Sequence, residues 1–329
     1  MTKLPISVVM AAYNEEEYIA ATIESILAQS FSNFEFIIVN DSSTDNTLQI
    51  INSYQDKRIV LLNNKKNLGL PKSLNKGIKK AEGRYIARTD ADEISSQDRF
   101  AEQIKILEAD SKIGVAASWY KLIDKDGKEL SKNQIPKDEY TVDDFLEKGP
   151  RFCHGSTMIR KSVFKEVGLY RPEFRYAQDL DLWLRIAQHY NFYVIPKYLY
   201  QRRLDSAVME KREQQRVFTA YAKKSALSRR EGLADPVAEL NKIDLDKLAD
   251  NISAKDKRAY YYYLISIKKI ENGDFLAAQK EILKAIAISP CLIRLWYRLF
   301  FNFLPQRVRE KAVESVQKIL ERVVVKNNY

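Results

Sequence analysis

Four short apolar segments alternate with helix-like segments in the first 90 residues, and this alternation restricts the fold more than any other feature of the chain. The apolar segments cover residues 6–11, 34–39, 59–63 and 85–89. Between them, apolar residues recur with the three- and four-residue spacing of an amphipathic helix. Strands that alternate with helices in this way predict an α/β fold whose central sheet is mostly parallel and doubly wound.

Polar residues follow three of these four expected strands. They lie at residues 13–15, 41–45 and 90–93, directly after the first, second and fourth apolar segments. Doubly wound sheets bind their ligands beyond the carboxyl ends of the strands. We therefore expect the three polar loops to form one site at this edge of the sheet.

The fourth strand ends in two aspartates that are two residues apart. In extended backbone Asp90 and Asp92 share one face, and Glu93 adds a third carboxylate. Carboxylate oxygens are ligands for divalent cations, which in turn can hold a phosphate group. Such a short motif also occurs in ordinary surface loops, and the alternative is a turn whose aspartate caps a helix near Gln97.

Two further helices can be placed from the sequence. Asn14 precedes three glutamates, and asparagine is a common N-cap while acidic residues in the first turn interact favourably with the helix dipole. We therefore expect Asn14 to cap a helix that begins with the glutamates. Residues 178–186 predict a second helix, which buries Leu182, Trp183 and Ile186.

Composition limits the class of protein. The chain has 329 residues, of which 45% are hydrophobic, which is enough for one large or two smaller domains. Its two cysteines, Cys153 and Cys291, form no disulfide framework, so a reducing cytoplasm fits best. We expect neither a signal peptide nor a membrane span. With two histidines in all, any metal would have to be held by carboxylates.

The net charge of +10 is compatible with nucleic acid, anionic membrane or phosphorylated substrates as partners. Ten Lys or Arg residues lie between Lys197 and Glu231. They form either a solvated helix face or a surface that faces an anion. We expect no nucleic-acid partner, because the basic stretch contains no known nucleic-acid-binding module.

The character of the chain changes from about residue 209 onward, where helix follows helix. Gly232 and Pro236 interrupt the pattern, and we expect a catalytic domain over residues 1–225 and a helical region over residues 226–329. Within the helical region, the spacing of several small and apolar residues predicts one tetratricopeptide-like hairpin, carried by Gly273, Phe275, Ala278, Ala285 and Pro290. A single repeat indicates a helical appendage rather than a peptide-binding array.

The last two apolar stretches leave two interpretations open. Residues 292–304 and 307–325 either pack against the rest of the chain or form basic, aromatic-rich helices that rest on a membrane interface. The expected location is therefore cytoplasmic, with peripheral contact at the inner face of the cell membrane under the second interpretation.

The ordered series of motifs resembles family 2 glycosyltransferases over roughly residues 4–208. The series runs through Tyr13-Asn14-Glu15, Asp41 to Asp45, Asn67-Leu-Gly69, Asn75-Lys-Gly77, Ala81-Glu-Gly83, Asp90-Ala-Asp92, His154-Gly155 and Gln178-Asp179-Leu-Asp181-Leu-Trp183. The resemblance implies a GT-A fold, a nucleotide-sugar donor with UDP as the favoured nucleotide, a divalent metal (Mn²⁺ or Mg²⁺), and transfer with inversion. The implied acceptor is a saccharide or a lipid-linked molecule in cell-surface polysaccharide or glycoconjugate synthesis.

The resemblance also implies roles for residues of the donor site. Asp92 matches the metal-binding aspartate, and Asp90 its neighbour that contacts the ribose or metal-bound water. Asp41 matches the aspartate that bonds the base, Tyr13 the aromatic that stacks on it, and Glu15 a nucleoside contact. Ala12, Lys72 and Ala91 are further implied donor contacts. The alternatives are a helix cap for residues 41–45 and an ordinary core aromatic for Tyr13.

Asp179 is the expected general base, since a carboxylate can take the proton of an acceptor hydroxyl as that oxygen attacks the anomeric carbon. Asp181 is the rival candidate, and both are alternatively acids placed near a helix N-terminus. The family often has Glu-Asp at this point, whereas this chain has Gln178 and Asp179, which leaves any acceptor contact by the preceding glutamate in doubt.

His154 is expected in the donor or acceptor pocket, with an interior structural histidine as the alternative. Many family members carry a Tyr-Arg-x-His stretch in a later loop, but here residues 200–203 contain no histidine. Arg202 or Arg203 is therefore expected to clamp the phosphates, because guanidinium groups pair with phosphate oxygens bidentately.

The sequence also leaves two alternative functions to consider. A nucleotidyltransferase that makes sugar nucleotides should carry a Gly-rich basic loop after the first strand, and residues 11–14 do not form one. A non-catalytic scaffold built around the helical region is the other alternative, and the retained aspartates argue against it.

Overall fold

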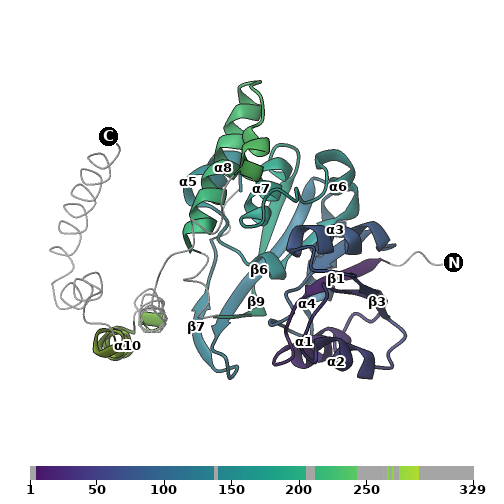
Figure 1. Ribbon diagram of the computed structural model, residues 1–329, viewed down its shortest axis with the longest axis vertical. Coiled ribbons are helices and arrows are strands. Elements are labelled where there is room, and N and C mark those ends of the chain that lie inside the picture. Colours follow the sequence, from purple (N-terminus) through teal and green to yellow (C-terminus); the bar gives the residue numbers. More distant parts are fainter. Residues whose placement is uncertain are drawn as a thin grey trace. The chain divides into compact units, whose positions relative to one another are not determined.

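The structure is a computed structural model that describes residues 5–136, 140–204, 212–242 and parts of 262–288 (Figure 1). The contacts divide the chain into two compact units, described separately here. The first contains Met1–Asp205 and Lys211–Asp250, and the second contains Ser206–Glu210 and Asn251–Tyr329. This division lies further along the chain than the boundary expected after residue 225.

One mixed sheet forms the centre of the first unit, and the described residues contribute nine strands to it. Its first four strands are those expected from the sequence, in the order β3-β2-β1-β4 and all parallel: β1 (Ile6–Ala12), β2 (Phe34–Asn40), β3 (Ile59–Asn63) and β4 (Tyr85–Arg88). Ala12 pairs with Asn40, which pairs with Asn63, so these three strands end level with one another. The expected α/β fold is confirmed.

The second half of the sheet is partly antiparallel. The long strands β6 and β9 are parallel to each other, while β8 is antiparallel to both β4 and β6. The strands of this half are β5 (Ile94–Ser95), β6 (Ile113–Ile123), β7 (Glu129–Asn133), β8 (Met158–Arg160) and β9 (Asn191–Arg203). β5 pairs with β9 at Ser95 and Tyr200. Residues 200–203, at the end of β9, therefore lie near the loop that follows β4.

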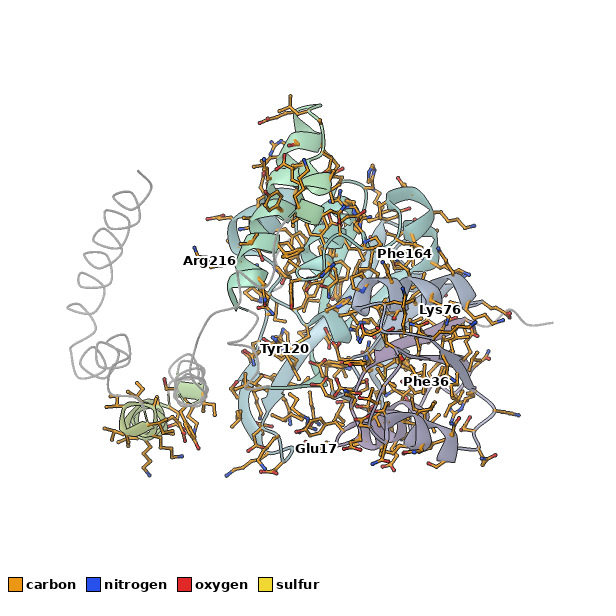
Figure 2. All side chains as sticks on the ribbon, in the orientation of Figure 1. Glu17, Phe36, Lys76, Tyr120, Phe164 and Arg216 are labelled. Atoms are coloured by element: carbon orange, nitrogen blue, oxygen red, sulfur yellow. The ribbon has the colours of Figure 1, made fainter. Side chains whose placement is uncertain are left out.

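Helices cover both faces of the sheet (Figure 1). One face packs against α1 (Ile19–Leu27), α2 (Thr47–Ser53) and α4 (Arg99–Ala109). The other face packs against α3 (Leu70–Lys80), α5 (Val142–Lys148), α6 (Lys161–Val167), α7 (Gln178–Ile186) and α8 (Arg212–Arg230). Phe36 of β2 belongs to the first face, and Lys76 lies on α3, which covers the second (Figure 2).

The expected helix start at Asn14 is wrong. The helix begins at Ile19, and the glutamates form a preceding turn in which the backbone N–H of Ile19 donates to the carbonyl of Glu15 at 2.9 Å. Asn14 has a φ of 57° and its side-chain oxygen accepts from the backbone N–H of Thr44 at 2.8 Å. The asparagine therefore links two loops instead of capping a helix.

The helix at Gln178–Ile186 is confirmed, with Leu182, Trp183 and Ile186 fully buried. Part of the basic stretch lies on α8, which packs into the core through Phe218, Ala222 and Ala226.

The second unit is described mainly by α10 (Phe275–Ile288), whose Ala278, Ile282 and Ala285 are buried. The rest of the expected tetratricopeptide-like hairpin, including Gly273 and Pro290, and the stretches at 292–304 and 307–325 lie outside the described residues. In the described part of the chain, no helix has the length and apolar character needed to cross a membrane.

Candidate functional site

The loops after β1 and β2 are joined by hydrogen bonds. The backbone N–H of Asp41 donates to the carbonyl of Ala12 at 2.8 Å, and that of Glu15 donates to Thr47 Oγ1 at 2.8 Å. Tyr13 is 45% exposed between these contacts, so it is not a core aromatic. The predicted convergence of the first two polar loops is therefore present, with the Tyr13 ring accessible to a ligand.

Strained backbone lies next to the expected site residues. In the described residues, positive φ outside glycine occurs at Asn14 (57°), Ser42 (66°) and Ala177 (54°). These positions directly follow Tyr13, directly follow Asp41, and lie two residues before Asp179, respectively. Left-handed backbone is costly for such residues and is found preferentially at functional sites, so the strain marks the loops after β1 and β2 and the turn that leads into α7.

Asp41 is buried and ties three segments together. Its carboxylate accepts hydrogen bonds from the backbone N–H groups of Leu68 and Gly69, each at 2.9 Å, and from Asn64 Nδ2 at 2.6 Å. These bonds fasten the end of β2 to the loop that leads into α3, on which Lys72 is exposed. Asp41 does not cap α2, because Asp45 Oδ1 accepts from the first helical N–H of that helix.

The acidic residues after β4 form a cluster with unequal proton affinities. Burial disfavours ionisation of Asp90, but the charge and hydrogen bond of Arg88, together with the charge of Arg202 and the nearby His154, outweigh burial and hold the pKa of Asp90 below its ordinary value. Burial and the charge of Asp90 raise the pKa of Asp92 to about 6. Burial and both aspartates raise the pKa of Glu93 well above its ordinary value. Ala91 is buried between them and its carbonyl accepts from Thr22 Oγ1 at 2.9 Å.

This cluster fits a divalent cation that arrives with a ligand. The raised pKa values of Asp92 and Glu93 come first from burial and then from neighbouring carboxylates, and a bound cation would offset that negative charge. Among the described residues, no three His, Cys, Asp or Glu side chains form a cage of their own. A cation held by one or two carboxylates and by phosphate oxygens is the usual arrangement for Mg²⁺.

The two arginines at the end of β9 have different roles. Arg203 donates to the carbonyls of Asp92, Asp124 and Lys125 at 3.0, 2.6 and 2.7 Å, and its guanidinium stacks on the ring of Tyr18. Its hydrogen bonds thus hold the acidic loop in place. The Arg202 side chain is 48% exposed, with Nε 4.0 Å from Glu93 Oε1. Of the two expected phosphate clamps, Arg202 is the accessible one.

The two aspartates of α7 are also distinguished by their contacts. Asp181 is fully buried and accepts from Arg171 Nε at 3.0 Å and from Arg185 Nη2 at 3.0 Å. Its carboxylate is committed to this structural network. Asp179 accepts from the backbone N–H of Leu180 at 2.8 Å, and burial and the nearby charge of Asp90 raise its pKa. Asp179 is therefore the better candidate base.

His154 is paired with a residue that had no expected role. Its Nε2 lies 2.6 Å from the hydroxyl of Tyr170, and burial together with the charge of Arg88 lowers the pKa of His154 to about 3. The imidazole is consequently neutral at physiological pH. Asn75 of α3 fixes Tyr170 through both backbone groups, at 2.7 and 3.0 Å.

Known proteins identify the family. The model of glycosyl transferase family 2 matches residues 7–168. An uncharacterized glycosyltransferase of Methanocaldococcus jannaschii is 34% identical over 233 residues, which is 68% of this chain and 80% of that protein. This chain belongs to glycosyltransferase family 2.

Two Bacillus subtilis proteins are also similar to this glycosyltransferase. The protein named as the glycosyltransferase EpsE is 36% identical over 213 residues, or 63% of this chain and 76% of EpsE. TuaG, named for teichuronic acid biosynthesis, is 32% identical over 183 residues, or 55% of this chain and 71% of TuaG. Membership of glycosyltransferase family 2 sets aside the nucleotidyltransferase and scaffold alternatives.

Solved structures share the GT-A fold with this glycosyltransferase. The mannosyltransferase PcManGT of Pyrobaculum calidifontis, in complex with GDP-Man and Mn²⁺, superimposes with a TM-score of 0.57 at 19% identity, covering 100% of this chain and 88% of that one. S. aureus TarS 1–349 in complex with UDP gives a TM-score of 0.53 at 17% identity, covering 85% of this chain and 88% of that one.

Three residues near the acidic cluster of this glycosyltransferase were not expected from the sequence. Tyr170 pairs with His154, the Tyr200 hydroxyl accepts from the backbone N–H of Asp90 at 3.2 Å, and Arg88 pairs with Asp90. Arg88 could have been found from the sequence, because it is a charged residue within an expected buried strand. Tyr200 begins the stretch compared with the Tyr-Arg-x-His motif, which is a local signal, whereas nothing in the local sequence marks Tyr170. Both tyrosines reach the site only through the fold.

Proposed function

We propose that this glycosyltransferase moves a sugar from a nucleoside-diphosphate donor, with UDP as the favoured nucleotide, to a hydroxyl of a saccharide or lipid-linked acceptor, with inversion. The observation that carries the proposal is the contrast on α7: Asp181 is held by two arginines, whereas no ion pair of Asp179 is found in the described residues. A half-buried carboxylate with a raised pKa is suited to accept a proton.

In the proposed reaction, the acceptor hydroxyl gives its proton to the Asp179 carboxylate while its oxygen forms the bond to the anomeric carbon. The bond from that carbon to the phosphate oxygen breaks, and the nucleoside diphosphate leaves with the electron pair. A single displacement on the face opposite the leaving group inverts the configuration.

The proposed donor site uses the three loops. Tyr13, Ala12 and Glu15 hold the nucleoside, with Asp41 and Lys72 beside them. Asp90 and Ala91 meet the ribose and the diphosphate, and Arg202 pairs with the phosphate oxygens. His154 lies in the sugar or acceptor pocket. Asp92 would hold a divalent cation, Mn²⁺ or Mg²⁺, whose charge offsets that of the leaving group; the Mn²⁺ complex of PcManGT is consistent with this.

Relatives support a place in polysaccharide synthesis, because TuaG is named for teichuronic acid biosynthesis. We propose a saccharide or lipid-linked acceptor of that kind, at the cytoplasmic face of the membrane. Peripheral membrane contact through the basic C-terminal segments, which the sequence predicts to be helical, is also part of the proposal.

A screen of UDP-glucose, UDP-galactose, UDP-N-acetylglucosamine and GDP-mannose with Mn²⁺ or Mg²⁺ tests the donor. Asp179→Asn should bind the donor as the wild type does but lose transfer by about 10²- to 10⁴-fold. Asp126→Asn is the matched control, since Asp126 is 71% exposed in the turn between β6 and β7. Failure of all four donors to bind would reject the function, and full activity of Asp179→Asn would reject the assigned base.

A further inference from the structure

Arg88 is a buried cation at the carboxyl end of β4. Its side chain is 3% exposed, and its Nη2 forms an ion pair with Asp90, two residues along the chain. Arg88 is the last residue of a strand that lies between β1 and β8 in the middle of the sheet. A guanidinium at such a position needs acceptors for all its N–H groups, because burial removes it from water.

Part of this guanidinium has no partner. Arg88 Nε and Nη1 are buried, and no acceptor for either lies within the described residues. Together these atoms carry three N–H bonds, since Nε has one and Nη1 has two. Unpaired buried donors of this kind are rare in folded proteins and call for an explanation.

The neighbouring polar groups are already engaged. The Tyr170 hydroxyl pairs with His154 Nε2 at 2.6 Å, and the Tyr200 hydroxyl lies 3.2 Å from both the backbone N–H of Asp90 and Thr89 Oγ1. The charge of Arg88 acts on His154 and on both tyrosines, so its guanidinium lies within this cluster. The groups around Arg88 thus belong to the candidate site, and the remaining donors of Arg88 have no partner among the described residues.

The charge of the cluster limits what that molecule can be. Asp90 neutralises Arg88, and the carboxyl groups of Asp92, Glu93 and Asp179 act electrostatically in the same cluster. In the proposed site Arg202 and a cation at Asp92 hold the diphosphate, and Asp90 already neutralises the Arg88 guanidinium. A neutral hydroxyl is therefore the acceptor that the remaining donors of Arg88 suit.

We infer that Arg88 binds the transferred sugar, with Nε and Nη1 donating hydrogen bonds to a hydroxyl oxygen of the donor's sugar ring. The inference rests on the proposed nucleotide-sugar donor. Under this inference Arg88 contacts the sugar rather than the nucleotide, because its charge acts on His154 and Tyr170, which belong to the proposed sugar or acceptor pocket.

The variant Arg88→Lys distinguishes binding of the sugar from binding of the nucleotide. Lysine keeps the positive charge that pairs with Asp90, but it lacks the planar guanidinium group and the additional N–H donors that this group carries. Affinities are measured by calorimetry for UDP and for whichever UDP-sugar of the screen binds the wild type most tightly. We expect the UDP-sugar affinity to fall about tenfold or more, and the UDP affinity to change by less than about twofold.

Arg84→Lys is the matched control, because Arg84 directly precedes the same strand but is exposed and paired with Glu108. It should change neither affinity. Equal losses of UDP and UDP-sugar affinity in Arg88→Lys would show a purely structural role, and unchanged affinities would show no role; either result overturns the inference.

Monodeoxy analogues of the same UDP-sugar test the wild-type protein without any substitution. One analogue should bind about tenfold more weakly than the parent, and this difference should disappear in Arg88→Lys. Equal binding of all monodeoxy analogues to the wild type overturns the inference even if the variant does not fold. If the wild type binds no nucleotide sugar at all, the proposed function fails first, and the two failures are thereby distinguished.

Discussion

The carboxylate of Asp41 accepts a hydrogen bond from the backbone N–H of Gly69 at 2.9 Å, so the end of β2 holds the start of α3. Gly69 has a φ of 83°, a conformation that other residues rarely adopt. The remaining contacts of Asp41, to Leu68 and Asn64, close the same loop. Asp41 therefore shapes the wall of the proposed base pocket in addition to any contact it makes with the base.

Asp41→Asn should destabilise the loop between β3 and α3, which Asp41 holds by hydrogen bonds. The new amide group turns an N–H donor toward backbone N–H groups that need an acceptor, which should lower the free energy of unfolding by about 1–3 kcal/mol. Urea denaturation measures this loss, and titration with UDP should show weaker binding. Asp126→Asn, on an exposed turn, should leave both quantities unchanged. A variant at Asp41 with wild-type stability would mean that the loop does not depend on this carboxylate.

Substituting the two arginines of β9 separately should give different results. Arg202→Ala removes an exposed guanidinium, so it should weaken binding of UDP several-fold with little change in thermal stability. Arg203→Ala removes hydrogen bonds to three backbone carbonyls and should lower the melting temperature. Calorimetry and thermal melting of the two variants measure these effects. Unchanged UDP affinity in Arg202→Ala would exclude it as a phosphate clamp.

Gly155→Ala should destabilise the protein. A Cβ at this position would lie 2.1 Å from the Tyr200 hydroxyl and 2.6 Å from Glu93 Oε2, closer than atoms can approach. Relieving this overlap moves buried side chains, which costs about 1–3 kcal/mol. Because the Tyr200 hydroxyl also bonds the backbone of Asp90, donor binding should weaken as well.

The combination with Tyr200→Phe provides the check on this explanation. Removing the hydroxyl eliminates the shortest of the contacts, so the double variant should lose less stability than the sum of the two single variants. Strictly additive losses would show that the two residues do not clash.

The sequence was sufficient for the first four strands because each is a short apolar run bounded by polar loops. The same alternation placed Asp41, Asp90 and Tyr13 at one edge of the sheet. It failed at Asn14, whose side chain bonds Thr44 across the site, a contact that no local pattern reveals. Tertiary contacts overrode the helix-cap preference there.

The division of roles within pairs also depended on the fold. Asp179 and Asp181 are equivalent by sequence until Arg171 and Arg185 are seen to hold the second. Arg171 lies outside α7 and approaches Asp181 only through the folded chain. Long-range pairs of this kind are not contained in the spacing of either residue.

The pH dependence of transfer should report on Asp179. Burial, the largest influence, and the charge of Asp90 raise its pKa above the ordinary value of 3.8. Since only the ionised carboxylate accepts a proton, kcat should rise with pH through this raised pKa, and the acid limb of the profile should lie above pH 3.8.

The folded protein binds the proton of Asp179 more tightly than the unfolded chain does, so the contribution of Asp179 to stability falls as pH rises through the same range. Asp179→Asn removes that unfavourable ionisation and should melt at a higher temperature than the wild type at pH 7, with the difference narrowing toward pH 4. Thermal melts of both proteins across this range measure it. A lower melting temperature for the variant at pH 7 would show that the ionised carboxylate stabilises the fold, contrary to the proposed role as a destabilised base.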